Sequence, residues 1–176
     1  VQAQLSKTVE LTEAGTLEAQ LGEDVGKITE LIVKGPLNEA DFVTMKEKMK
    51  SIQVLDMGGV TELPFENRRV GETRVPFSVI PSSAFEGKLT LRKVVFPPVV
   101  EIISRDAFRG CSNLVEVDFS LAGNLKRIDK SVFLACNNIK KLDLSNCREL
   151  ECIEMNSFCA CANLQSVDLT GCEKLE

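Results

Sequence analysis

The side chains that could carry chemistry in this 176-residue chain are its seven cysteines and its acids, because the sequence contains no histidine. Without imidazole, the commonest general base, the commonest metal ligand and every histidine-containing triad are missing. The sequence also contains no Gly-rich phosphate loop and no nucleophile elbow. We therefore expect a protein that is not an enzyme and that holds no cofactor.

The cysteines recur with the length of a repeat rather than with the spacing of a metal site. Two sets recur at intervals of 25 residues: Cys111, Cys136 and Cys161, and Cys147 and Cys172. Cys159 and Cys161 form a CxC pair without a second pair or a histidine at ligand spacing, so no metal site is expected. Columns of inward-facing structural thiols are the favoured interpretation, and disulfide bonds between neighbouring coils are the alternative.

Polar side chains recur at the outward positions of short segments whose apolar residues alternate. Alternation with period two predicts strands. Six of these positions are candidates for partner binding: Lys93, Glu116, Asp118, Lys141, Asp143 and Asp168. A solvated polar stripe in which the acids are tolerated is the simplest interpretation; recognition of a basic or hydroxylated protein surface is the functional alternative, and a divalent-cation site is a third. Glycoside cleavage by paired carboxylates is not expected, because an open ladder offers no pocket that raises a pKa.

An internal repeat predicts the elements that position these side chains. Phe85, Phe108, Phe133 and Phe158 are separated by 23, 25 and 25 residues, and a column of isoleucines keeps the same steps. Units of 20 to 29 residues, each with one short strand, are typical of leucine-rich repeats. We predict an α/β leucine-rich-repeat solenoid with one short strand per coil in a parallel concave sheet. Irregular, 3₁₀ or short helical segments should form the convex side, and the Phe column should lie in the core.

Several motifs of this repeat resemble a known family. Residues 80–85 read Ile-Pro-Ser-Ser-Ala-Phe, residues 103–108 read Ile-Ser-Arg-Asp-Ala-Phe, and later units contain Phe-x-x-Cys-x-Asn-Leu. They are similar to the BspA-like leucine-rich repeats of bacterial surface and secreted proteins, especially in the Bacteroides group. The sequence departs from this pattern at Lys88, which stands where the repeat has cysteine. The resemblance implies adhesion or host-protein binding, at the cell surface or after secretion.

One structural domain with three segments is expected. Residues 1–60 are predicted as an N-terminal cap with degenerate repeats and an amphipathic helix from Asn38 to about Ser51. Asn38 and Asp41 have the spacing of a capping box at its start. The resemblance to the family extends to this cap through the Gly15-Thr-Leu opening. Residues 80–176 hold the regular repeats.

Residues 61–79 interrupt the repeat and are predicted as an irregular insertion loop. Loops on rigid scaffolds often carry recognition, and a tolerated insertion is the alternative. The candidate recognition residues of this loop are Arg68, Arg69, Arg74 and Phe77.

Charge and hydropathy restrict the partners. The net charge is −5, so the broad basic field that holds nucleic acid or anionic lipid is missing. The sequence contains no run of about 20 apolar residues, which is the length needed to span a membrane. The expected partner is a protein, from a host or a bacterial surface. The alternative function is a structural spacer or assembly segment of a longer envelope protein, with self-association through the C-terminal coil, because the last repeat stops before its Ile and Phe.

Overall fold

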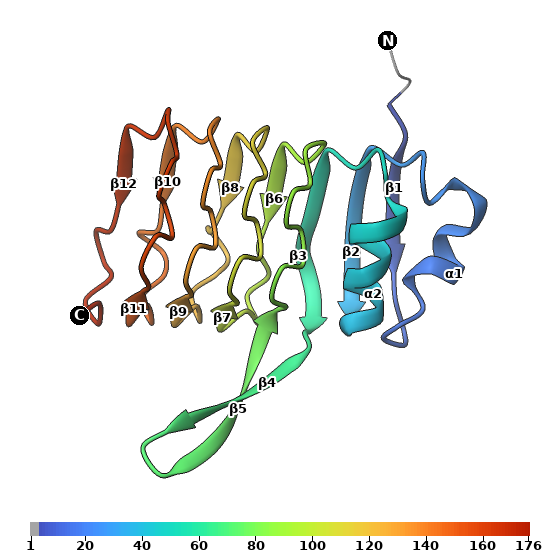
Figure 1. Ribbon diagram of the computed structural model, residues 1–176. Coiled ribbons are helices and arrows are strands. Elements are labelled where there is room, and N and C mark those ends of the chain that lie inside the picture. Colours follow the sequence, from blue (N-terminus) through green and yellow to red (C-terminus); the bar gives the residue numbers. More distant parts are fainter. Residues whose placement is uncertain (1–3) are drawn as a thin grey trace.

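The structure is a computed structural model that describes residues 4–176 as a row of short strands with the two termini at opposite ends (Figure 1). The strands that form the first sheet are parallel and lie in the order β1 (Ser6–Glu10), β2 (Glu30–Pro36), β3 (Val54–Glu62), β6 (Lys93–Val95) and β8 (Glu116–Asp118). The parallel pair β10 (Lys141–Asp143) and β12 (Ser166–Asp168) continues this row beyond β8. We call the whole row the first sheet.

A second sheet runs along the other side of the repeats. Its order is β11 (Cys152–Ile153), β9 (Arg127–Ile128), β7 (Ile102–Ile103), β5 (Thr73–Ile80) and β4 (Phe65–Val70), and only the pair β4 and β5 is antiparallel. A regular repeat therefore contributes one strand to the first sheet, as predicted, and a second strand of two residues on the other side, where irregular, 3₁₀ or short helical segments were predicted. A two-residue strand is too short to show alternation, so the sequence contained no signal for it.

The core lies between the two sheets and confirms the predicted Phe column. Phe85, Phe108 and Phe133 are completely buried, and Phe158 in the last coil is partly buried. Successive rings are stacked with centroids 5.1, 5.5 and 6.0 Å apart, a favourable offset distance for aromatic pairs. Phe96 stacks on Phe119 in the same way at 5.0 Å.

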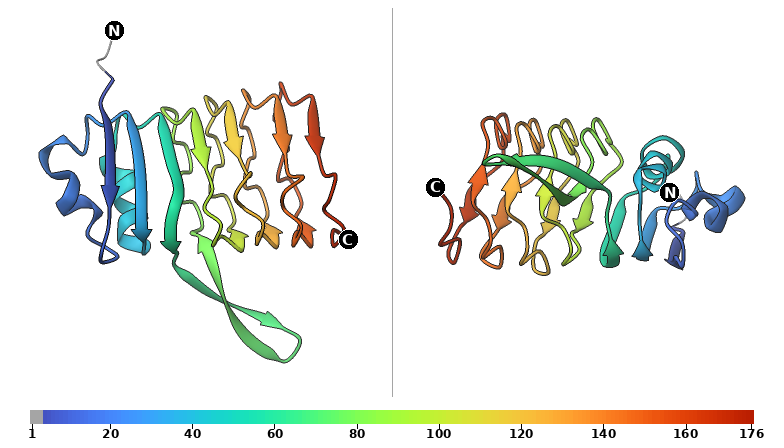
Figure 2. Two further views of the ribbon diagram at one scale, coloured as in Figure 1. Left: turned by 180° about the vertical axis from the view of Figure 1, so that it is seen from behind. Right: turned by 90° about the horizontal axis from the view of Figure 1, so that it is seen from below.

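The helices lie near the N-terminal end. Helix α1 (Leu17–Leu21) lies beyond β1, and α2 (Glu39–Val43), which continues as a π-helical segment over Thr44–Lys48, lies against one face of the first sheet (Figures 1 and 2). The capping box of Asn38 and Asp41 is confirmed. The Asp41 carboxylate is 1% exposed and also accepts hydrogen bonds from the N–H groups of Gly15 (2.7 Å) and Leu17 (3.0 Å). One carboxylate thus satisfies backbone donors at the start of both helices.

Lys88, which interrupts the cysteine column, joins the helical end to the repeats. Its ammonium donates to the carbonyls of Met45 (3.0 Å) and Lys46 (2.7 Å), in the segment that follows α2. In the next coil the Cys111 thiol occupies this place and donates to the Phe85 carbonyl, with 3.0 Å between Sγ and O. Position 88 needs a longer side chain than cysteine, because the carbonyls that accept its hydrogen bonds lie at the end of a helix and not in a neighbouring coil. Burial lowers the pKa of Lys88.

Residues 61–79, predicted as an irregular loop, instead end β3 and form the antiparallel hairpin of β4 and β5. The strands pair from Phe65 with Ser78 to Val70 with Thr73, around a tight turn whose Gly71 has φ of 60°. Glycine at the first central position of a two-residue loop is a hairpin signal that the interpretation as a loop missed. The hairpin projects from the row of coils and bends toward the C-terminal half (Figures 1 and 2). It is thus an ordered arm.

Candidate interaction surfaces

The six predicted positions on the strands all lie on the outer face of the first sheet, in two parallel rows. The register places Lys93 beside Glu116 and Lys141 beside Ser166 in one row. It places Val95 beside Asp118 and Asp143 beside Asp168 in the other. Parallel strands are about 4.8 Å apart, so side chains in one row are within reach of a single partner segment.

The first row is internally neutralised at one end. Lys93 Nζ lies 2.6 Å from Glu116 Oε1, and this hydrogen bond is the largest cause of the raised pKa of Lys93. Lys141 has no carboxylate at ion-pair distance among residues 4–176. Glu116 is therefore less available to a partner than the aspartates of the second row.

The aspartates of the second row hold the turns that end their strands. Oδ1 of Asp118, Asp143 and Asp168 accepts a hydrogen bond from the N–H of the residue two positions later, at 2.8, 3.0 and 2.8 Å. This is an Asx-turn, in which the side chain imitates a backbone turn. The signal in the sequence is the Ser or Thr two residues after each Asp, whereas sequence reasoning considered the aspartates only as binding residues. One oxygen of each carboxylate serves the turn, and the second remains available.

A notch interrupts the first sheet between β8 and β10. In the neighbouring pairs, the N–H groups of Phe96 and Leu144 donate to the carbonyls of Asp118 (3.0 Å) and Asp168 (2.9 Å). Between β8 and β10, no such backbone hydrogen bond joins Phe119 to Asp143 among residues 4–176. The notch has a volume of about 150 Å³ and is lined by Glu116, Val117, Asp118, Phe119, Ser120, Asp143 and Asn146. Three carboxylates therefore surround the one break in the described row.

The four candidate residues of the hairpin fall into two groups. Arg68 faces the second sheet, where its guanidinium donates to both carboxylate oxygens of the buried Asp129 and to Glu66 (3.0 Å). The pKa of Arg68 is raised, chiefly by the hydrogen bond with Asp129. Phe77 lies under Lys126, with Nζ 5.2 Å from the ring centroid. These two residues anchor the hairpin, whereas Arg69 and Arg74 are exposed and lie opposite each other.

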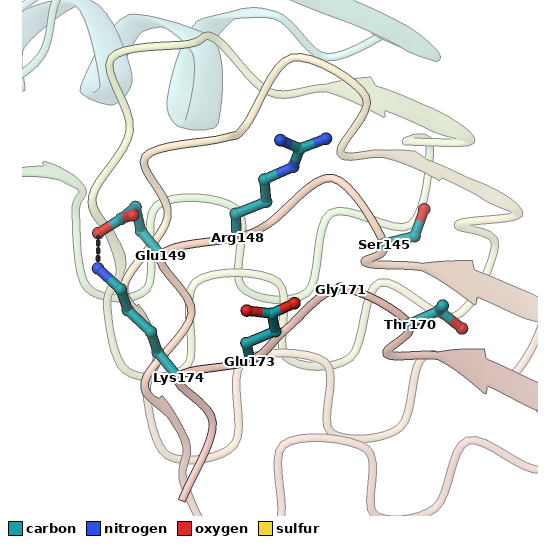
Figure 3. Close-up of a pocket in the computed structure, with 7 residues that line it drawn as sticks. All are labelled: Ser145, Arg148, Glu149, Thr170, Gly171, Glu173 and Lys174. Carbon is teal, nitrogen blue, oxygen red and sulfur yellow. Dashed lines mark hydrogen bonds and ion pairs between the residues drawn. The ribbon is translucent and has the colours of Figure 1, made fainter.

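Two larger open pockets contain residues that sequence reasoning did not single out. One, of about 490 Å³, is lined by the hairpin residues Glu66, Arg68, Arg69 and Val70 together with Arg127 and Glu151. The other, of about 500 Å³, is formed by the turns of the last two coils (Figure 3). Its lining residues are Ser145, Arg148, Glu149, Thr170, Gly171, Glu173 and Lys174. Glu149 pairs with Lys174 at 2.6 Å, and Arg148 points away from both (Figure 3).

The cysteines contribute structure to the repeats. All seven are free thiols, and Cys111, Cys136 and Cys147 are buried in the predicted inward columns. Burial is the largest cause of their raised pKa values, which reach about 12 for Cys111 and Cys147. Among residues 4–176, no group of three or more His, Cys, Asp or Glu side chains is placed to hold a metal ion. No helix in the same range is long and apolar enough to cross a membrane.

Comparison with known proteins identifies the repeat. A family model described as BspA type leucine rich repeat region matches residues 78–176 in six copies. No curated protein matches the chain.

Three solved structures are similar to the chain. A leucine-rich repeat protein from Bacteroides capillosus is 28% identical, with a TM-score of 0.46, over 59% of this chain and 70% of that one. The leucine-rich repeat protein of T. pallidum is 21% identical, with a TM-score of 0.43, over 81% and 72%. A leucine-rich repeat protein from Bacteroides ovatus is 22% identical, with a TM-score of 0.46, over 86% of this chain and 48% of that one.

Proposed function

The chain belongs to the BspA-type leucine-rich repeat family, and we propose that it is a noncatalytic protein-interaction module of an extracellular bacterial protein. Leucine-rich repeats mediate protein–protein interactions, and adhesion to a host or bacterial surface protein is the role that we assign to this one. In this proposal residues 80–176 form the regular part of a solenoid, and the helices within residues 1–60 cap its first coil. The outer face of the first sheet is the binding surface.

The fixed aspartates of the second row carry this proposal. Each of Asp118, Asp143 and Asp168 is oriented by its Asx-turn, so little side-chain entropy is lost when a partner binds. The second oxygen of each carboxylate can accept a hydrogen bond from a partner. Stacked like charges repel one another, and a basic or hydroxylated partner relieves this repulsion. The notch between β8 and β10 offers a place for one such side chain.

The test separates the charge of the aspartates from their role as hydrogen-bond acceptors in the Asx-turns. Asn at positions 118, 143 and 168 keeps an Oδ1 acceptor for the Asx-turn and removes the charge, whereas Ala removes both. The parent, the triple Asn variant and the triple Ala variant are immobilised and exposed to host and bacterial surface extracts, and retained proteins are identified by mass spectrometry. We expect a protein that the parent retains and the Asn variant releases, with an unchanged melting temperature.

A matched control changes the same number of charges elsewhere. Glu13, Glu23 and Glu39 are exposed acids outside the first sheet, and their replacement by Gln should leave retention unchanged. Equal retention by the parent and the triple Asn variant would move the binding site away from this face.

A structural spacer or assembly segment is the second candidate function, with self-association through the C-terminal coil. The exposure of Met155 (67%) and Leu169 in the last described coil favours it. Light scattering over a range of concentrations tests it with Met155→Glu and Leu169→Glu combined, and Leu121→Glu in an earlier coil is the control. A parent that stays monomeric at every concentration contradicts this function.

A further inference from the structure

We propose that the outward face of the β4–β5 hairpin binds an acidic segment of a partner protein, with Arg69 and Arg74 as its charged contacts and Phe65 as its apolar contact. This surface is distinct from the outer face of the first sheet, and the inference does not depend on that site. It assigns opposite charge preferences to two surfaces of one molecule.

The hairpin is fixed to the scaffold by one face only. Residues alternate across a strand, so Glu66 and Arg68 point to one side and Phe65 and Arg69 to the other. The first side carries the contacts with Asp129 and, through Phe77 opposite Glu66, with Lys126. At the base, the Ser78 N–H donates to Glu101 Oε2 at 2.9 Å. These contacts hold the arm in place and leave its outward face uncovered.

The charge on the outward face is unbalanced. Arg69 and Arg74 are directly opposite in the register, and neither has an ion-pair or hydrogen-bond partner among residues 4–176. Like charges directly opposite on a sheet are unfavourable, and cross-strand Cβ atoms are about 5 Å apart. A carboxylate that approaches both guanidinium groups relieves the repulsion and forms charge-assisted hydrogen bonds. The arrangement is therefore suited to an anionic group.

An aromatic ring completes the face. The side chain of Phe65 is 64% exposed at the start of β4, on the same side as Arg69. Arginine and aromatic residues are enriched in the centres of protein interfaces. A partner segment that carries an acid and an apolar side chain on one face matches this surface.

A short acidic protein segment fits the charges better than a polyanion does. The hairpin itself contains Glu66 and Glu72 beside its three arginines, and the whole chain has a net charge of −5. A negative molecule repels nucleic acid and anionic membranes over long range, whereas one or two carboxylates are attracted locally by the arginine pair. The occupant is thus a protein segment of low charge density.

The experiment measures binding of a labelled peptide of alternating Glu and Val to the complete protein by fluorescence anisotropy. Alternation places all acids on one face of an extended peptide. Arg69→Gln combined with Arg74→Gln should weaken the affinity by about tenfold, the effect of two partly solvated charge contacts. The control, Lys140→Gln combined with Arg148→Gln, changes the net charge equally at a distance from the hairpin and should leave the affinity within about twofold. Both double variants should fold, because the changed side chains are exposed and make no ion pairs.

Three results overturn the proposal. The first is a parent protein that does not bind the acidic peptide or that binds the matching Lys and Val peptide through the same arginines. The second is an equal loss of affinity in both double variants, which indicates unspecific attraction. The third is tighter binding of phosphatidylserine vesicles or duplex DNA than of the peptide, again lost with Arg69 and Arg74, which assigns the face to a polyanion.

Discussion

At the scale of single residues, several side chains in each repeat make hydrogen bonds to backbone groups of a neighbouring turn or coil. The thiols of Cys111 and Cys136 donate to carbonyls of the preceding coil, and the amides of Asn113 and Asn138 do the same on the surface. The aspartates of the outer face serve their own turns. A residue type recurs with the period of the coil because the backbone group that it satisfies recurs with that period.

Thiol reactivity tests the inward columns. In the native protein at pH 8, iodoacetamide should modify the exposed Cys159 first and leave Cys111 and Cys147 unmodified, because a thiol with a pKa of about 12 is thiolate in only about one molecule in ten thousand. Peptide mapping by mass spectrometry measures the order of modification, and denatured protein is the control. Equal rates at Cys111 and Cys159 would contradict the burial of the column.

The same thiols predict a fall of stability in alkali. Burial raises the pKa of Cys111 and Cys147 from 9.0 to about 12, so the unfolded chain loses these protons at lower pH than the folded chain does. Their contribution is complete below pH 9 and is lost as pH rises toward 12. Urea unfolding at several pH values should show a shallower fall for Cys111→Ala with Cys147→Ala than for the parent. An identical pH slope in the two proteins would exclude the thiols as its cause.

At the scale of elements, the residue type in the left-handed turns varies between coils, and the hairpin interrupts the repeat. Two residues after each Phe of the column the backbone has positive φ, and this position holds Gly87 and Gly110 in two coils but Ala135 and Ala160 in the others. A left-handed conformation costs a residue with a Cβ about 1–2 kcal/mol, and glycine avoids this cost. The alanine coils therefore contain avoidable strain.

Ala135→Gly should stabilise the protein by about 0.5–1 kcal/mol, because the relief of strain exceeds the added freedom of the unfolded chain. The control is Ala107→Gly, at a buried position without positive φ, which should destabilise by about 1 kcal/mol. Both values come from urea unfolding. A loss of stability in Ala135→Gly would contradict the left-handed geometry of this turn.

The hairpin is predicted to depend on one arginine and not on its neighbour. Arg68→Ala leaves the buried Asp129 without its bidentate partner and should cost about 1–3 kcal/mol, with faster proteolytic cleavage within residues 61–79. Arg69→Ala removes an exposed side chain and should change stability by less than about 0.5 kcal/mol. Limited proteolysis and urea unfolding of both variants measure the difference. Equal behaviour of the two variants would show that Arg68 does not hold the arm.

At the scale of the whole molecule, side-chain contacts link each coil to the next. The Phe rings stack in sequence from Phe85 to Phe158, and α2 contacts the first of them through Phe42, with centroids 6.0 Å apart. In such a stack each coil is stabilised mainly by its neighbours, so a local defect weakens the coils around it more than distant ones.

Phe133→Ala should therefore strongly destabilise the coils around it and affect distant coils little. The completely buried ring is replaced by a cavity, at a cost of about 3–5 kcal/mol. Hydrogen exchange should accelerate most in residues 108–158, whereas the amides of β1, β2 and β3 should keep their protection. Uniform acceleration along the whole chain would show that the repeats unfold as one unit instead.

The sequence by itself determined the repeat length, the Phe column, the capping box of Asn38 and Asp41 and the outward positions of the first sheet. Equal positions in stacked coils have equal surroundings, so the period of the residue types is also the period of the structure. Only the tertiary structure decided the rest. The second sheet is held by backbone hydrogen bonds between two-residue strands that have no side-chain pattern. Arg68 anchors the hairpin, unlike Arg69 and Arg74, because it contacts Asp129, which is 61 residues away in the chain. Neither partner shows in its own neighbourhood that the other will lie beside it, because only the folding of the arm over the coils brings them together.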